Sequence, residues 1–213
     1  MTMRLALTAL RLGFGLLALS AIVRQLAIQA GMGFSLVNFF SYFTNLSNLS
    51  AALVLVFSAC RGLAGREPSA AEDAARTVSA VNMAVVGIVY AALLRDVDLG
   101  SLLPWVNVVL HIVMPCTVVL DWLAQPSSVR LGLRHILRCL VFPAVYLAYV
   151  LIRGSGTGWY PYPFLNPANV GGYGGVAVYA LGIAITFAGV ACALLAWSRF
   201  GVRPRPGAAP ARR

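Results

Sequence analysis

The sequence predicts an all-α, polytopic membrane protein with six transmembrane helices. Hydrophobic residues make up 60% of the 213-residue chain and charged residues only 10%. Soluble domains contain about 45–50% apolar and about 25% charged residues, so this chain has too few charges to cover its apolar surface in water. The same composition excludes a disordered chain, and it excludes a nucleic-acid-binding module despite the net charge of +10. We expect the chain to contact membrane lipids and no nucleic acid.

Six apolar stretches are each long enough to cross a hydrocarbon layer, which needs about 20 residues per helix. The first of them lacks the short apolar core and cleavage site of a signal peptide, so it is interpreted as a span. The predicted spans are residues 8–29, 38–60, 76–95, 102–124, 133–153 and 175–198. Together they predict one transmembrane domain over residues 1–200 and a disordered, Arg- and Pro-rich cytoplasmic tail over 201–213.

The distribution of arginines predicts the orientation, because positive residues accumulate on the cytoplasmic side. With the N-terminus inside, twelve arginines lie in the cytoplasm and three outside. Both termini are therefore predicted to be cytoplasmic.

Four hydrogen-bonding side chains share one face at the start of the second span. At about 100° per residue their positions fall within one narrow arc; they are Ser41, Thr44, Asn45 and Asn48. Such groups need partners other than lipid. Two interpretations are open: the side chains join neighbouring helices, or Thr44 is a reactive hydroxyl.

The fourth span carries a polar stripe with a histidine. Asn107, His111 and Asp121 share one face because spacings of three and four return to the same side of a helix. An ionisable side chain within a span often marks a functional site, and Asn107 is one turn away, where it can fix the imidazole tautomer. Pro115 removes the backbone bond to the His111 carbonyl, which predicts a kink there. The alternative is a neutral histidine bonded to a neighbouring helix.

Asp121 is predicted to act elsewhere, since it lies roughly 15 Å along the axis from His111. We expect it to pair with Arg130 or Arg134 near the cytoplasmic surface. His135 is predicted near the membrane face opposite to His111, so the two histidines cannot share a haem. The sequence contains no cluster of Cys, His and carboxylate residues typical of a metal site, and we expect no metal and no other cofactor.

An aromatic loop stiffened by prolines follows the fifth span. Tyr160, Tyr162 and Phe164 alternate with prolines in it. Two interpretations are open: an aromatic belt at the membrane interface, or a lid over the outer mouth of the bundle.

Three motifs together resemble the androgen-induced membrane protein family. They are the Tyr-Phe-Thr-Asn-Leu-Ser-Asn segment that starts at Tyr42, the Asn107-x-x-x-His111 pair with a proline soon after it, and the Tyr-Pro-Phe-Leu segment that starts at Tyr162. Eukaryotic members of this family are threonine hydrolases that cleave fatty acid esters of hydroxy fatty acids. The resemblance implies that Thr44 matches the catalytic threonine and His111 the catalytic histidine.

The implied chemistry is the hydrolysis of a lipid ester. A threonine hydroxyl becomes nucleophilic when a base removes its proton, and His111 is the matching base and later acid. Amide groups of Asn45 or Asn48 are the candidates for stabilising the oxyanion, and Asn107 is the candidate for orienting the histidine. The substrate is expected to enter sideways from the outer leaflet with its tails in hydrocarbon.

The motifs also depart from the eukaryotic pattern, with more polar residues after Thr44 and a proline four residues after His111. These departures suggest a bacterial-type branch, and hence a multi-pass protein of the bacterial inner membrane. Two alternatives to a hydrolase stay open: a non-catalytic membrane protein that binds a lipid or regulates a partner, and a small transporter. The predicted span starts place His111 roughly 14 Å deep and Thr44 roughly 9 Å deep, so a dyad requires tilt or an earlier start of the second span.

Overall fold

The protein is a bundle of six long helical units in the computed structural model, which describes residues 2–97, 100–127 and 133–201. Every regular element of these residues is a helix, and six helices are long and apolar enough to cross a membrane. The six units are α1 (Thr2–Gly31), α3 (Phe43–Leu63), α4 with η1 (Ala70–Val89 and Tyr90–Leu94), α5 with η2 and α6 (Pro104–Val108, Val109–Val113 and Met114–Ala124), α7 (Leu133–Thr157) and α8 (Tyr173–Gly201). The all-α, six-span fold is thereby confirmed.

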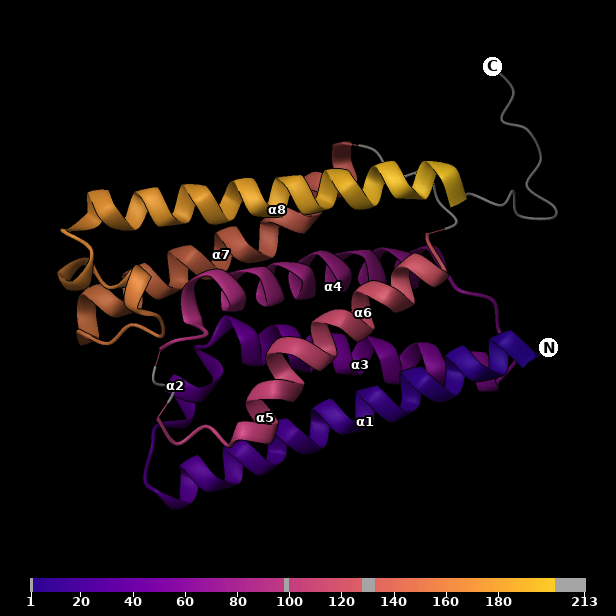
Figure 1. The fold of residues 1–213 in the computed structure, drawn as a ribbon, viewed down its shortest axis with the longest axis horizontal. Coiled ribbons are helices and arrows are strands. Elements are labelled where there is room, and N and C mark those ends of the chain that lie inside the picture. The colour runs from indigo at the N-terminus through magenta and orange to yellow at the C-terminus, as the bar shows by residue number, and fades with distance from the viewer. Residues whose placement is uncertain (1, 98–99, 128–132, 202–213) are drawn as a thin grey trace.

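Short helices connect the long ones at one end of the bundle (Figure 1). They are α2 (Leu36–Phe40), η3 (Pro163–Leu165) and η4 (Pro167–Asn169). We call this the loop end. The start of α1 and the end of α8 lie at the opposite, terminal end (Figure 1). The predicted tail, apart from Gly201, lies outside the described residues, and α8 continues helically to Gly201.

Small residues bring α1 and α3 close together. A Cβ added at Gly15 would lie 2.8 Å from Cγ2 of Val56 and 3.1 Å from the carbonyl oxygen of Ala52. Ala18 and Ala51 of the same two helices are fully buried. Membrane helices associate through such small residues because their backbones can then approach closely.

A buried ion cluster joins α1, α4 and α6 towards the terminal end. Nε of Arg11 donates to Oδ1 of Asp121 at 2.6 Å, and Arg76 donates to Oδ2 at 2.9 Å. Arg11 also donates to Gln125 at 2.6 Å. The predicted pairing of Asp121 with Arg130 or Arg134 is wrong for Arg134, which does not pair with it, while Arg130 lies outside the described residues. Two arginines inside the bundle need a counter-charge more than an exposed arginine does, because they lack water.

Two of the long units contain a turn of π-helix at the same level. Pro115 has no N–H for the carbonyl of His111, and the N–H of Met114 instead reaches the carbonyl of Val109, five residues back. The interruption predicted at His111 therefore takes the form of a π-turn, η2. Gly87 lets α4 approach this turn, because a Cβ there would lie 3.1 Å from Cβ of Pro115. The second π-turn, η1, continues α4 directly beyond this contact.

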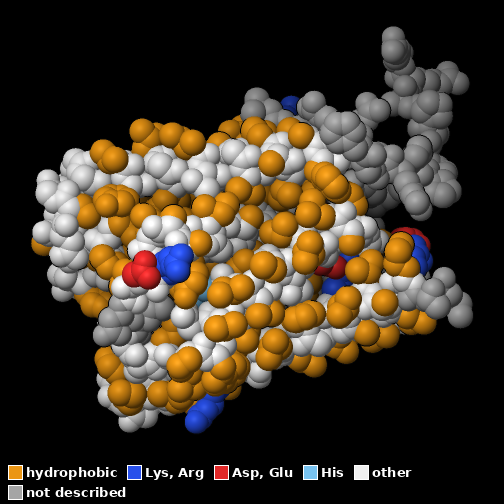
Figure 2. Space-filling view, viewed as in Figure 1, with side chains coloured by type: hydrophobic (Ala, Val, Ile, Leu, Met, Phe, Trp, Pro, Cys, Tyr) orange, Lys and Arg blue, Asp and Glu red, His pale blue; other side chains and the backbone are white. Residues whose placement is uncertain are grey.

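The long faces of the bundle are apolar. Figure 2 shows hydrophobic side chains over the length of the visible face, with charged side chains as a few separate groups. This surface, together with the six helices, is that of a multi-pass membrane protein.

Candidate functional site

Thr44 lies in the first turn of α3, immediately after a break in the chain direction. The second span was predicted to run on from residue 38, but α2 ends at Phe40 and Tyr42 is extended, with φ −79° and ψ 125°. Ser41 therefore does not share the helix face of Thr44, Asn45 and Asn48, and that part of the prediction is wrong. Ser41 Oγ instead bonds to the carbonyl of Val37 and to the hydroxyl of Tyr149.

Tyrosine hydroxyls accept the unpaired N–H groups at the start of α3. The first N–H groups of a helix have no partner within it, and Tyr42 makes no side-chain cap. The N–H of Phe43 donates to Tyr146 Oη, and the N–H of Thr44 donates to Tyr162 Oη, each at 3.2 Å. These bonds hold the turn that carries Thr44 against α7 and the loop of residues 158–172.

Tyr162 also contacts the side-chain hydroxyl of Thr44. Its hydroxyl lies 3.4 Å from Thr44 Oγ1, and both residues are buried. Burial raises the pKa of Tyr162 above its ordinary value, an effect that the hydrogen bonds with Thr44 partly offset. The phenol is therefore neutral around pH 7 and keeps a proton to donate.

His111 lies on the π-turn η2 with a defined tautomer. Its Nδ1 is 3.2 Å from the backbone carbonyl oxygen of Asn107. A carbonyl oxygen only accepts, so Nδ1 carries the proton and Nε2 keeps its lone pair. Nε2 is thus the nitrogen available to act as a base.

Tyr90 fixes the imidazole from a second side. The two rings stack with centroids 4.4 Å apart and planes inclined by 22°, and one ring comes from each π-turn. The amide of Asn107 donates to Tyr90 Oη at 2.9 Å. Asn107 therefore contacts His111 through its backbone and supports the stacked ring through its side chain.

Asn45 and Asn48, the two residues predicted to stabilise the oxyanion, differ in how many of their amide hydrogens are already donated. Both amide hydrogens of Asn48 are donated, one to the carbonyl of Thr44 and one to that of Leu110, at 2.9 and 3.0 Å. This arrangement ties α3 to η2 beside His111. Among the described residues, Asn45 donates once, to the carbonyl of Phe39 at 2.8 Å, and so retains a second N–H.

Two cavities meet at Thr44. A polar cavity of about 450 Å³ opens at the loop end and is lined by Thr44, Asn45 and His111, among other residues. An apolar cavity of about 350 Å³ lies between α4, α7 and α8 and is also lined by Thr44. Only Thr44, Leu94 and Tyr162 line both, as far as the described part of the chain shows.

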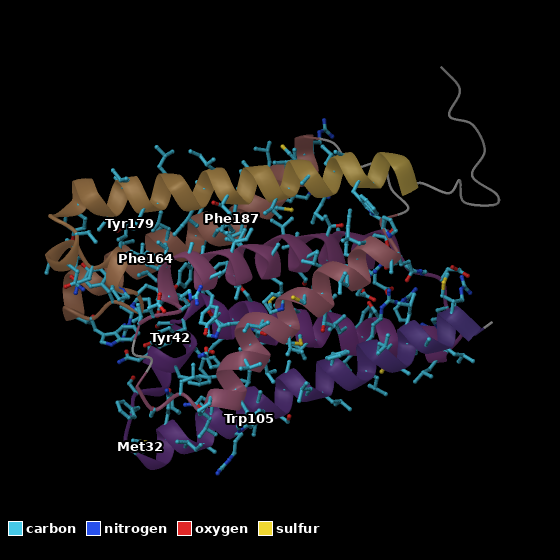
Figure 3. All side chains as sticks on the ribbon, in the orientation of Figure 1. Met32, Tyr42, Trp105, Phe164, Tyr179 and Phe187 are labelled. Atoms are coloured by element: carbon cyan, nitrogen blue, oxygen red, sulfur yellow. The ribbon has the colours of Figure 1, made fainter. Side chains whose placement is uncertain are left out.

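The aromatic loop forms part of both cavities. Tyr160 and Tyr162 line the polar cavity, and Tyr162 and Phe164 line the apolar one. The rings of Tyr162 and Phe164 stack with centroids 5.2 Å apart. Figure 3 shows Phe164 at the loop end near the start of α8. The loop is thus packed into the bundle around Thr44. Its role as a lid stays a prediction.

Sequence reasoning missed Tyr90 and the direct contact of Tyr162 with Thr44. A tyrosine inside a span needs a partner for its hydroxyl. Tyr90 lies inside the predicted span 76–95, so its position could have indicated a polar contact there. Gln25 was missed for the same reason: it lies in the first span, is 2% exposed, and pairs with the backbone of Ser101 and Leu103. It fixes the segment that leads into α5.

The fold and these contacts define a multi-pass membrane protein with a buried threonine, tyrosine and histidine around two adjoining cavities. The sequence model of the FAR-17a/AIG1-like protein family matches residues 36–195. The match covers most of the chain and all three motifs, so the protein belongs to this family and the predicted resemblance is confirmed. No curated protein and no solved structure gives a match. The bacterial-type branch and the cytoplasmic position of the termini stay predictions.

Proposed function

We propose that the protein is an intramembrane hydrolase of fatty-acyl esters that uses Thr44 as nucleophile and His111 as base. The observation that carries the proposal is the position of Thr44 at the junction of an apolar and a polar cavity. An ester of a fatty acid has the same two parts, an acyl chain on one side of the carbonyl and an oxygen-linked group on the other.

In the proposed reaction, Thr44 Oγ1 attacks the ester carbonyl while its proton passes to Nε2 of His111. The resulting oxyanion is stabilised by the remaining N–H of Asn45 and by the hydroxyl of Tyr162. The N-terminus of α3 adds a positive dipole end beside Thr44. His111 then protonates the leaving alcohol, and an acyl-threonine ester remains.

A water molecule completes the cycle. His111 removes a proton from it as it attacks the acyl-threonine, and the released fatty acid restores Thr44. The polar cavity is wide enough for several waters, since each occupies about 30 Å³ in the liquid. Within the described residues, Thr44 Oγ1 bonds to Tyr162 and not to His111, so the first proton transfer uses a bridging water or a rotation of Thr44.

A fluorophosphonate probe that labels reactive serine and threonine hydroxyls tests the proposal. The purified protein should be labelled at Thr44. Thr44→Ala should abolish labelling, and Thr44→Ser should preserve it. Thr186→Ala is the matched control, because Thr186 bonds within its own helix and lines neither cavity. A protein that binds lipid without catalysis gives no labelling in any form, and that result overturns the hydrolase.

A further inference from the structure

Helices α7 and α8 provide one wall of the apolar cavity. Figure 3 shows Phe187 on the side of α8 towards α4, further from the loop end than Phe164 of η3. The lining residues from these two helices include Ala144, Ala184 and Phe187. No charged side chain lines this cavity among the residues that the structure describes.

Two of these lining residues are exposed on the outside of the bundle. Ala144 of α7 and Ala184 of α8 both line the cavity and are both exposed. Their neighbours Val145 and Ile185 are more than 60% exposed but do not line it. The apolar cavity therefore reaches the surface between α7 and α8, beside the small side chains of two alanines.

The surface around this opening faces hydrocarbon. Ala184 lies roughly 16 Å along the axis from the start of α8, which is about half of a 30 Å hydrocarbon layer. Exposed apolar side chains surround it, such as Val141 and Leu181. The α7 and α8 spans are also the least buried of the six, with 11% and 17% of their apolar windows buried.

We propose that the acyl chain of a membrane lipid enters the apolar cavity sideways, through a portal between Ala144 and Ala184. The inference extends the proposed function by giving the route by which the ester reaches Thr44. The cavity of about 350 Å³ has room for about twelve groups the size of a water molecule, which suits one acyl chain. Its described lining has no charged side chain to pair with a polar head. The head of the lipid stays on the side of the polar cavity, beyond Thr44.

Filling the portal tests the route. Ala144→Trp and Ala184→Trp each place an indole in the opening. Val145→Trp and Ile185→Trp are the matched controls, because they add the same side chain one position away, on the lipid-facing surface. Size-exclusion profiles of the four proteins in detergent identify any variant that does not fold. If one portal variant fails, the other still decides the outcome.

The probe is a fatty acid with a photoreactive diazirine, incorporated in phosphatidylcholine vesicles that contain the protein. After irradiation, the native protein should be cross-linked at cavity residues such as Val85 and Phe187. The two portal variants should lose these cross-links, and the two controls should keep them. Absence of cavity cross-links in the native protein, or their persistence in both portal variants, overturns the portal.

A second assay separates the portal from the hydrolase. With a long-chain ester in the bilayer, the portal variants should lose turnover. With a short water-soluble ester, which reaches Thr44 from the polar cavity, they should keep it. If no ester is cleaved by any form of the protein, the hydrolase is wrong, and the cross-linking result still decides whether acyl chains use the portal.

Discussion

The hydroxyl of Tyr162 lies 3.2 Å from the backbone nitrogen of Thr44 and 3.4 Å from its Oγ1. One phenol thus accepts from the first turn of α3 and contacts the proposed nucleophile. Since Tyr162 belongs to the loop between α7 and α8, the position of Thr44 depends on a segment that is more than 110 residues away in the sequence.

Tyr162→Phe should lower kcat by about one to two orders of magnitude, the scale of losing one donor to an oxyanion. Folding should be retained, because the two hydrogen bonds that the variant loses contribute about 1 kcal/mol each. The check is steady-state turnover of a short ester. Tyr179→Phe is the control, since Tyr179 packs on Phe164 but lines neither cavity. Equal kcat values for the two variants would remove Tyr162 from the mechanism.

Tyr162 should also make stability fall at high pH. Burial raises the pKa of this phenol above its ordinary value of 10.0, so the folded protein holds the proton more tightly than the unfolded chain. The resulting stabilisation is complete below pH 10 and is lost as the pH rises through the folded pKa. Thermal unfolding in detergent should show a steeper decline above pH 10 for the native protein than for Tyr162→Phe. Parallel curves contradict this account.

Tyr90 should act on turnover through the position of His111. Tyr90→Phe keeps the stacked ring and loses the bond from Asn107, whereas Tyr90→Leu loses both. Aromatic stacking contributes about 0.5–1.5 kcal/mol, so the leucine variant should have a kcat up to about tenfold below that of the phenylalanine variant. KM should be unchanged, because Tyr90 lines neither cavity. A change in KM alone indicates that Tyr90 affects binding instead.

Asp121→Asn should destabilise the bundle strongly. The variant leaves Arg11 and Arg76 buried without their shared counter-charge, and breaking such a buried pair costs about 3–5 kcal/mol. Denaturation in mixed detergent measures the change. Asp96→Asn is the control, because Asp96 pairs with Arg95 at the surface, where both are largely exposed, and such pairs contribute little. Similar stabilities for the two variants would show that the cluster is not important for folding.

The fold was predictable from the sequence because it depends on local composition. A span is recognised by its own roughly 20 residues, and His111 stands out as an ionisable group within one. Thr44 was selected by the resemblance to the family, and the roles of both residues stay predictions. The break at Ser41 and Tyr42 was not predictable in this way. The segment contains no glycine or proline, and the backbone there is held by tyrosines of α7 and of the loop of residues 158–172.

Pairings between distant residues were the part that sequence reasoning could not supply. Asp121 was assigned to arginines about ten residues away, whereas its partners come from α1 and α4, as far as 110 residues away. The contact of Tyr162 with Thr44 likewise joins residues that are far apart in the sequence. Periodicity shows which side of a helix is polar, but it does not show which helix that side meets.

The pairing of Arg11 with Asp121 also constrains biogenesis. Arg11 belongs to α1, and Asp121 is synthesised 110 residues later. An arginine costs about 2.5–3.5 kcal/mol at the centre of an inserting helix, and one nearer a helix end, such as Arg11, can extend towards the interface. The charge of Arg11 is therefore without Asp121 until the α5–α6 span has been synthesised, so the ion cluster can form only once that span is in the membrane.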